Sequence, residues 1–218
     1  MPDIVQRLRN VPSALLSDSV RGMHTLDPGI RCLTPGLKLV GPAFTVLAEA
    51  GSIITVHKAL LEAPEGAVLV VGGETGKDLR SAMFGKLMSL QAQHCGILGL
   101  VLDGSVRDLT DVIELGFPVY ARGTSPRVGL NRRVGRTQLP VPCGGMIVNP
   151  GDFVCGDEDG VTIIPVEIAE RVVEQAEERL RKEADLARRI RDGEHITDMI
   201  GFTELINDSE GSRQPDGV

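Results

Sequence analysis

The centre of the chain repeats one pattern, a short buried strand followed by a loop and a helix. Segments 67–71 and 97–102 are nearly continuous aliphatic runs, as expected for strands buried on both faces. Helical stretches follow them, one ending at His94 and one over residues 109–115, and residues 118–121 begin a third strand. This order predicts a parallel sheet with right-handed crossovers.

Less regular segments flank this centre. Residues 3–22 have a helical pattern with a break at Pro12, and the apolar run 37–48 predicts one or two strands. Over residues 134–165, short apolar segments alternate with tight turns, which predicts antiparallel hairpins and hence a mixed sheet. A long charged helix is expected from residue 166 to about residue 191.

The length and composition limit the number of domains. A chain of 218 residues with 42% apolar residues suits a single α/β domain, which we expect over residues 1–207. Residues 208–218 have the composition of a disordered tail. With one Tyr, no Trp and five Phe, the core must consist mainly of aliphatic side chains.

The charge and hydropathy argue against nucleic-acid and membrane partners. A net charge of −7 disfavours phosphate-backbone binding, and the scarcity of aromatic residues disfavours base stacking. No apolar run approaches the roughly 20 residues of a membrane span, and the N-terminus lacks a signal-peptide pattern. We therefore expect a cytoplasmic protein whose four widely spaced cysteines are buried thiols: Cys32, Cys95, Cys143 and Cys155.

Three common site patterns are incomplete in this sequence. The loop 72–78 resembles a nucleotide P-loop, but its spacing is one residue short and Asp78 replaces the Ser or Thr. The acidic turn 157–160 is too short for an EF-hand. The four histidines lack zinc-ligand spacing: His24, His57, His94 and His195.

The most informative local segment runs from Asp103 to Asp108, after a buried strand and at the start of a helix. In a parallel sheet this is the carboxyl end of a strand, where α/β ligand sites form. Arg107 can hold a carboxylate and Asp108 a hard cation. The alternative interpretation is a helix start with an acidic first turn and a solvated arginine.

A second helix begins near Gly85, Lys86, Leu87 and Met88. Free backbone N–H groups at a helix N-terminus attract anions, and Gly85 permits close approach. Because this turn also follows a strand, we expect it to lie beside Arg107. Two adjacent turns of this kind suit the binding of a small carboxylate.

The long helix has an apolar seam interrupted by Glu183. A charge on such a seam is costly unless it is paired or faces a ligand; the alternative is a shallow seam from which Glu183 reaches solvent. The other seam positions are Val173, Ala176, Leu180, Ala187 and Ile190.

These residues belong to a pattern that resembles the regulator of ribonuclease activity A-like family, which includes the class II 4-hydroxy-4-methyl-2-oxoglutarate (4-carboxy-4-hydroxy-2-oxoadipate) aldolases. The resemblance covers roughly residues 10–190. It is carried by Ser17-Asp18-Ser19, His57-Lys58-Ala59-Leu60, the run 66–73, the run 99–108, Gly123-Thr124-Ser125-Pro126, and the run from Asn149-Pro150-Gly151-Asp152 to Asp159-Gly160-Val161.

The resemblance implies an α/β/α sandwich like the phosphohistidine swivelling domain, with a mixed sheet and a long C-terminal helix. It also implies a homo-oligomer, either a trimer or a dimer of trimers. The family's site lies between subunits and uses a divalent metal cation, Mg²⁺ or Mn²⁺. By position, Asp108 would bind that metal, and Glu183 would reach its waters from a neighbouring subunit.

The same resemblance implies how substrate is bound. Arg107 would hold a small 2-oxo acid and stabilise its enolate, while the turn at Gly85 and Lys86 presents the backbone N–H groups of Leu87 and Met88 to the carboxylate. Cleavage of a 4-hydroxy-2-oxo acid leaves pyruvate enolate, which a cation and a guanidinium stabilise. Oxaloacetate decarboxylation passes through the same enolate and is an expected side activity.

Lys86 departs from the family pattern, because the aldolases have an acid there that holds metal-bound water. An ammonium group weakens local cation affinity. Three outcomes stay open: a weaker metal site, an extra substrate carboxylate bound by Lys86, or loss of aldolase activity. A Schiff base is conceivable if burial depresses the pKa of Lys86.

Two functions follow from these residues. The first is a metal-dependent lyase in which Arg107 and Asp108 are catalytic. The second is a non-catalytic binding protein resembling the inhibitor of ribonuclease E, for which Asp108 would be dispensable.

Overall fold

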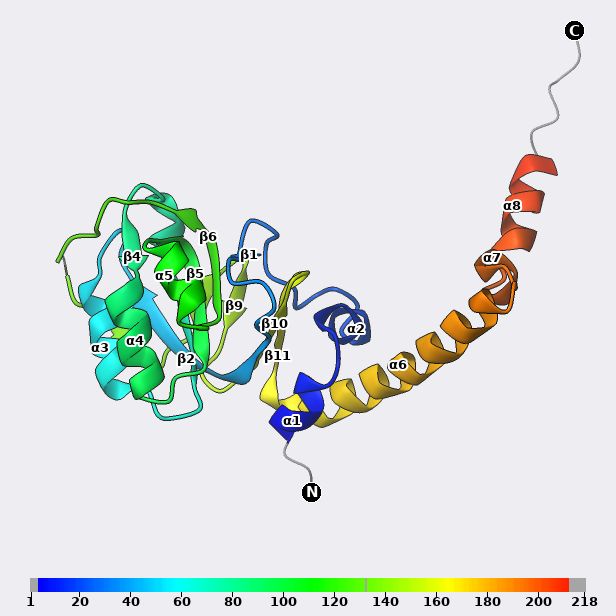
Figure 1. Cartoon of the computed structure of the whole chain (residues 1–218), viewed down its shortest axis with the longest axis horizontal. Coiled ribbons are helices and arrows are strands. Elements are labelled where there is room, and N and C mark those ends of the chain that lie inside the picture. The colour runs from blue at the N-terminus through cyan, green and yellow to red at the C-terminus, as the bar shows by residue number, and fades with distance from the viewer. Residues whose placement is uncertain (1–3, 132, 212–218) are drawn as a thin grey trace, which may run out of the picture. The chain divides into compact units, whose positions relative to one another are not determined.

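The computed structural model describes residues 4–131 and 133–211. Within them, nine strands form one mixed sheet in the order β1-β6-β5-β3-β2-β10-β11, with β4 beside β5 and β7 beside β2 (Figure 1). Strands β2, β3, β5 and β6 are mutually parallel, so the predicted parallel centre of the sheet is confirmed. The strands are β1 Arg31–Cys32, β2 Leu39–Ala48, β3 Val68–Gly73, β4 Ala82–Phe84, β5 Gly99–Val106, β6 Val119–Thr124, β7 Arg136–Thr137, β10 Phe153–Asp157 and β11 Gly160–Ile164.

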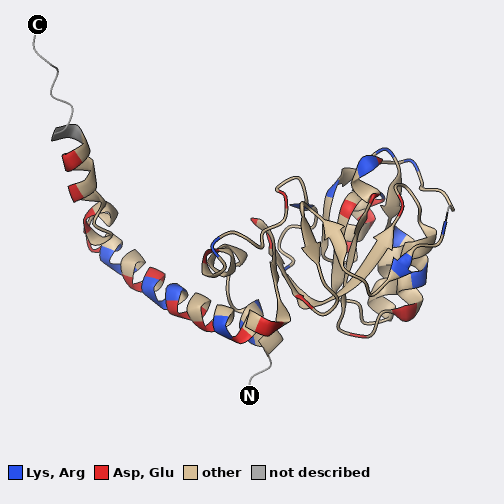
Figure 2. Ribbon diagram, turned by 180° about the vertical axis from the view of Figure 1, so that it is seen from behind, with Lys and Arg blue, Asp and Glu red and all other residues tan. Residues whose placement is uncertain are grey.

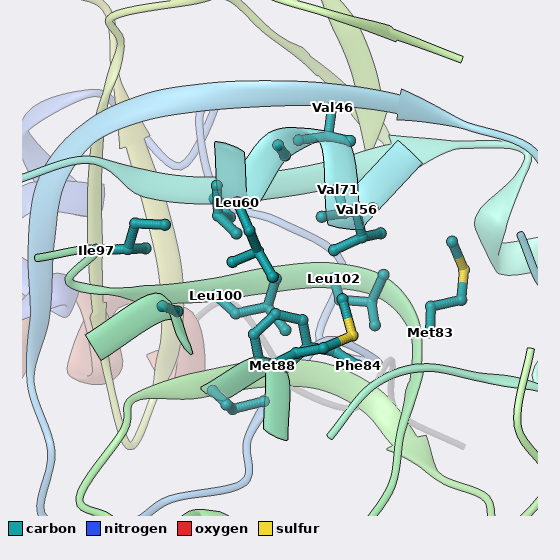
Figure 3. Close-up of a cluster of buried hydrophobic side chains, with 14 of the residues drawn as sticks. Val46, Val56, Leu60, Val71, Met83, Phe84, Met88, Ile97, Leu100 and Leu102 are labelled. Atoms are coloured by element: carbon teal, nitrogen blue, oxygen red, sulfur yellow. The ribbon is translucent and has the colours of Figure 1, made fainter. Parts of the chain in front are cut away.

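One face of the sheet is covered by α3 (Ile54–Glu62), α4 (Lys86–His94) and α5 (Leu109–Glu114). Leu69 and Val71 of β3 point into this layer, whereas Val68 and Val70 point to the other face. Both sets are buried, which explains the continuous apolar run in the sequence. Figure 3 shows side chains of this layer, where helix residues meet strand residues such as Leu100 and Leu102.

The opposite face of the central strands is covered by a hairpin of β8 (Val141–Cys143) and β9 (Met146–Val148). The predicted second helical layer is therefore replaced here by strands. The cause is local: Gly144 and Gly145 both adopt positive φ, which makes a tight turn. A Cβ on Gly72 would lie 2.2 Å from the carbonyl oxygen of Pro142, so glycine lets the hairpin approach β3. The likeness to the swivelling domain stays a prediction.

A third apolar cluster lies at the β10–β11 end of the sheet. It contains side chains from α1 (Ile4–Arg9), α2 (Ser13–Ser19) and the first two turns of α6 (Ala169–Arg191). Strand β10 pairs antiparallel with both β11 and β2, which confirms the predicted hairpin character of this region.

The chain forms two compact units, Met1–Ala176 and Glu177–Val218. The buried residues of α6 all lie at or before Ala176, so the first unit ends where the helix stops contributing to a core. The second unit contains the rest of α6, α7 (Ile196–Met199) and α8 (Phe202–Gly211). Figure 2 shows charges of both signs along α6.

The expected domain limits, residues 1–207 and a tail from 208, stay a prediction. Helix α8 includes residues 208–211 of that tail, and residues 212–218 lie outside the described residues. Among the described helices, none is long and apolar enough to cross a membrane. The cytoplasmic location stays a prediction.

Candidate functional site

The first half of the candidate site is the turn between β4 and α4. Strand β4 pairs parallel with β5, so the turns that follow the two strands lie side by side. The first α4 backbone bond runs from the Ser89 N–H to the Gly85 carbonyl, at 2.9 Å. The N–H groups of Leu87 and Met88 precede it in the first turn of the helix, where intrahelical acceptors are lacking. They can therefore bind an anion.

The second half is the turn between β5 and α5. The Arg107 N–H donates to the Phe84 carbonyl at 2.9 Å, which ties this turn to the end of β4. Asp108 adopts the left-handed conformation, with φ 56° and ψ 37°. In this conformation its Oδ2 accepts a hydrogen bond from the Lys86 N–H at 3.2 Å. Left-handed residues other than glycine cost free energy and concentrate at functional sites.

Gly85 allows the two turns to approach each other. A Cβ built on Gly85 would lie 2.8 Å from Oδ2 of Asp108 and 2.9 Å from Cγ of Arg107. A larger residue would push both side chains away from the α4 N-terminus.

Arg107 and Asp108 form a long ion pair, with 3.4 Å between Nε and Oδ2. Their side chains are 40% and 37% exposed. Within the part of the chain that the structure describes, Asp108 is the carboxylate that pairs with Arg107, and the guanidinium makes no side-chain hydrogen bond. The guanidinium is therefore available to a carboxylate or enolate oxygen.

A cavity of about 130 Å³ lies where the two turns meet. Its volume is below the roughly 300–1,000 Å³ typical of sites for drug-sized ligands, so it suits a small molecule. Most of its lining is apolar. The lining residues are Ile53, His57, Ala82, Met83, Phe84, Gly85, Leu87, Met88, Arg107, Asp108 and Val128.

The structure brings together most of the predicted site residues. Gly85, Leu87, Met88, Arg107 and Asp108 all line the cavity, as expected for two adjacent strand-to-helix turns. Sequence reasoning missed a further part of the lining, which Ile53, His57 on α3 and Val128 in the loop after β6 supply. His57 belongs to a segment that carries the family resemblance, but its place at the site, like that of Ile53 and Val128, depends on tertiary packing.

Lys86 is directed elsewhere. Its ammonium lies 2.5 Å from Oδ1 of Asp111 on α5, and its side chain is absent from the described cavity lining. The hydrogen bond to Asp111 raises the pKa of Lys86 above its usual value. A Schiff-base lysine requires the opposite shift, so that interpretation was wrong. Binding of a substrate carboxylate by the Lys86 side chain stays a prediction.

Asp108 provides one carboxylate toward a divalent cation. Its Oδ2 accepts from the Lys86 N–H and contacts Arg107, whereas no contact is found for Oδ1 among the described residues. Those residues also contain no cluster of three His, Cys, Asp or Glu side chains of the kind that holds a metal. Mg²⁺ commonly retains several waters and uses one or two carboxylates plus substrate oxygens, so Asp108 fits a hydrated, weakly held cation.

Glu183 lies in the second unit and is exposed on α6. Its predicted contact with metal waters involves a neighbouring subunit and stays a prediction. The burial of its apolar seam decreases along the helix: Val173 and Ala176 are buried, whereas Leu180 and Ile190 are 36% and 44% exposed.

A second Arg–Asp pair uses the other end of the predicted Asp103–Asp108 segment. Arg122 Nε lies 2.5 Å from Oδ1 of Asp103, and Oδ2 of Asp103 accepts from the Gly144 N–H at 2.9 Å. Arg122 also contacts Asp27 at 3.3 Å. The hydrogen bond to Asp103 raises the pKa of Arg122. These groups hold the β8–β9 turn and the loop before β1 on the sheet, away from the cavity.

Known proteins share both the sequence and the fold. The RraA-like model, described as Aldolase/RraA, matches residues 13–163. A protein of Halalkalibacterium halodurans named "Putative 4-hydroxy-4-methyl-2-oxoglutarate aldolase" is 34% identical over 183 residues, covering 84% of this chain and 85% of that protein.

Two solved structures are similar over most of the chain. An uncharacterized protein from Pseudomonas syringae pv. tomato has a TM-score of 0.80 and 28% identity, with 89% of this chain and 91% of that one covered. Streptomyces coelicolor RraAS2, described as an unusual member of the RNase ES inhibitor RraA family, has a TM-score of 0.76 and 28% identity, with coverage of 87% and 98%. The chain therefore belongs to the RraA-like family, which includes proteins named as aldolases and others named as ribonuclease inhibitors.

Proposed function

We propose that this protein is a lyase that cleaves a small 4-hydroxy-2-oxo acid of the 4-hydroxy-4-methyl-2-oxoglutarate type to pyruvate. The observation that carries the proposal is the cavity itself. It combines the α4 N-terminus, the Arg107 guanidinium and the left-handed Asp108 around a space suited to a small molecule. The name of the Halalkalibacterium halodurans relative supports the same substrate class.

Different groups of the chain bind different parts of the substrate. The N–H groups of Leu87 and Met88 bind the C1 carboxylate, aided by the positive end of the α4 dipole. Arg107 then faces the C2 ketone oxygen, where negative charge develops as the C3–C4 bond breaks. A preorganised cation at that oxygen stabilises the enolate more than the ketone and so lowers the barrier.

Asp108 would hold the divalent cation, Mg²⁺ or Mn²⁺. When bound, such a cation supplies further positive charge to stabilise the enolate. The Lys86 N–H fixes the Asp108 carboxylate, while the Lys86 ammonium stays on Asp111. Oxaloacetate, which loses carbon dioxide to give the same enolate, is a second substrate of this site.

We also propose that the active form is a homo-oligomer, a trimer or a dimer of trimers. The exposed seam positions Leu180 and Ile190 support this, because apolar side chains along a helix are stabilised when a partner covers them. In that assembly Glu183 would complete the site of a neighbouring subunit. Light scattering of the full chain measures the mass, and a stable monomer at micromolar concentration contradicts the assembly.

The test is pyruvate release, followed with lactate dehydrogenase and NADH, from 4-hydroxy-4-methyl-2-oxoglutarate and from oxaloacetate. Turnover in Mg²⁺ or Mn²⁺ that is lost in Asp108→Ala is the expected result. Absence of turnover with either metal, in a preparation whose oligomer is intact, overturns the proposal.

The second candidate is a non-catalytic inhibitor of a ribonuclease E-type endonuclease. The structural similarity to Streptomyces coelicolor RraAS2 favours it. Binding of the endonuclease with equal affinity by wild type and Asp108→Ala, together with no pyruvate release, would establish this function.

A further inference from the structure

The cavity has a third polar side chain, which the proposed mechanism leaves unused. Among its described lining residues, only His57, Arg107 and Asp108 carry ionisable side chains. Neither ring nitrogen of His57 has a hydrogen-bond partner among the described residues, so both remain available to a ligand. The other three histidines of the chain are not part of the described lining.

The cleavage reaction requires a proton acceptor that Arg107 and Asp108 cannot supply. Arginine stays protonated in proteins. Asp108 accepts the Lys86 N–H, contacts Arg107 and, in the proposed mechanism, binds the cation. An imidazole, whose unperturbed pKa is about 6.5, both accepts and donates a proton near neutral pH.

The position of His57 is fixed by its helix. The neighbouring Val56, Ala59 and Leu60 are buried in the core that also contains Phe84 and Met88 of the cavity wall (Figure 3). The His57 N–H donates to Ile53 at 3.1 Å within the same helix. The imidazole is therefore carried on a packed helix and lines the cavity together with Arg107 and Asp108.

We propose that His57 is the general base and acid of the reaction, an inference that rests on the proposed function. The His57 ring takes the proton of the C4 hydroxyl as C4 becomes a carbonyl. The electron pair of the C3–C4 bond passes to the enolate on C2 and C3. The protonated ring then returns the same proton to C3, which becomes the methyl group of pyruvate, so no further reactant is consumed.

The test compares two reactions at the same site. Decarboxylation of oxaloacetate breaks its C–C bond without removing a hydroxyl proton, so it depends less on a base. General acid–base catalysis contributes about 10²–10⁴-fold. We expect His57→Gln to lower kcat for 4-hydroxy-4-methyl-2-oxoglutarate by about 100-fold or more, and by at least tenfold more than it lowers kcat for oxaloacetate.

Two variants control for structural effects. His94→Gln changes an exposed histidine at the end of α4, outside the described cavity lining, and should leave both reactions within about twofold of wild type. In His57→Ala, added imidazole should restore part of the aldol cleavage in proportion to its unprotonated fraction, as a missing base requires.

The charged groups around α3 matter for a pH profile. On α3 and the elements that contact it, these groups are Lys58 and Glu62 on α3, Lys86 and His94 on α4, and Arg136 on β7; Arg107 and Asp108 share the cavity lining. The acidic limb of the wild-type kcat profile should disappear in His57→Gln. Equal losses of both reactions, or an unchanged limb, overturn the role of His57 while leaving the proposed function intact. A wild-type protein without pyruvate release from either substrate overturns both.

Discussion

Two Arg–Asp pairs, one between β5 and β6 and one in the turn after β5, differ in almost every respect. Asp103 and Arg122 are 14% and 22% exposed, lie 2.5 Å apart and have further partners in Gly144 and Asp27. Arg107 and Asp108 are about twice as exposed, lie 3.4 Å apart and border a cavity. Asp103 and Arg122, the closed pair, thus belong to a hydrogen-bonded network, whereas Arg107 and Asp108, the open pair, border a cavity.

The partners and exposure of the two pairs distinguish a structural ion pair from a functional one. In the closed pair, both carboxylate oxygens of Asp103 and two nitrogens of Arg122 have protein partners, so removal of one group leaves others unsatisfied. In the open pair, the backbone of Asp108 is strained and the Arg107 guanidinium makes only a long contact with Asp108. A strained backbone beside side chains with few protein partners is typical of a functional site.

Removal of the open pair should have the largest effect on activity. We expect Arg107→Ala or Asp108→Asn to lower kcat/KM for pyruvate release by about 100-fold or more, because the first removes the cation that faces the enolate and the second removes the carboxylate that would hold the metal. The melting temperature should stay within about 2 °C of wild type, since both side chains are partly exposed. Steady-state kinetics and thermal unfolding measure the two effects.

The matched control is Arg171→Ala, which removes an exposed arginine from α6. A loss of stability in Arg107→Ala as large as that in a core variant would show that the open pair is structural after all.

Removal of the closed pair should instead lower stability. Asp103→Ala leaves the Gly144 N–H and Nε of Arg122 without their acceptor, and we expect the free energy of unfolding to fall by about 1–3 kcal/mol. Urea unfolding measures this change. Asp159→Ala, in an exposed turn, should change it by less than about 0.5 kcal/mol. If folded Asp103→Ala loses activity as strongly as Asp108→Asn, the two pairs do not have separate roles.

Lys86→Asp should make the open site more anionic. The substitution frees Asp111 and places a third carboxylate near Asp108, so we expect Mn²⁺ to bind about tenfold more tightly, equivalent to roughly 1.4 kcal/mol. Calorimetric titration of the protein without substrate gives the affinity. Lys77→Asp reverses one exposed charge elsewhere and serves as the control. If the affinity for Mn²⁺ rises equally in both variants, the effect is due to net charge and not to the site.

Gly85→Ala should have the smallest effect. The added methyl group meets the carboxylate end of Asp108 and the aliphatic part of Arg107, two flexible side chains that can move aside at some cost in position. We expect KM to rise by about two- to tenfold with little change in stability. Gly123→Ala, whose Cβ would meet nothing within 4 Å, serves as the control. A larger KM effect in Gly123→Ala would argue against the close approach at Gly85.

The parallel centre of the sheet was predictable because short sequence patterns mark each of its strands and helices. The aliphatic run at β3 and the helix stop at Gly96 need no tertiary information, and Arg107 and Asp108 follow a strand by position alone. The hairpin over the second face was predicted as a hairpin, but its place in the fold depends on the approach of Gly72 to Pro142. Such a contact leaves no periodic signal.

The site was predicted in the part that two neighbouring strands determine, and missed in the rest. His57 and Val128 reach the cavity because α3 and the loop after β6 pack over β4, a non-local outcome. The partner of Lys86 was missed for the same reason, since Asp111 lies on α5, 25 residues away. A sequence pattern gives the identity of a charge but not the group that neutralises it.

The two pairs also bear on how such a protein changes over generations. Because the closed pair holds loops together without touching the cavity, substitutions at Arg107 and Asp108 can remove the chemistry while the surface and the fold persist. Proteins with this fold can therefore lose catalysis and gain a binding function while the fold stays the same. That freedom matches a family whose members are named both as aldolases and as ribonuclease inhibitors.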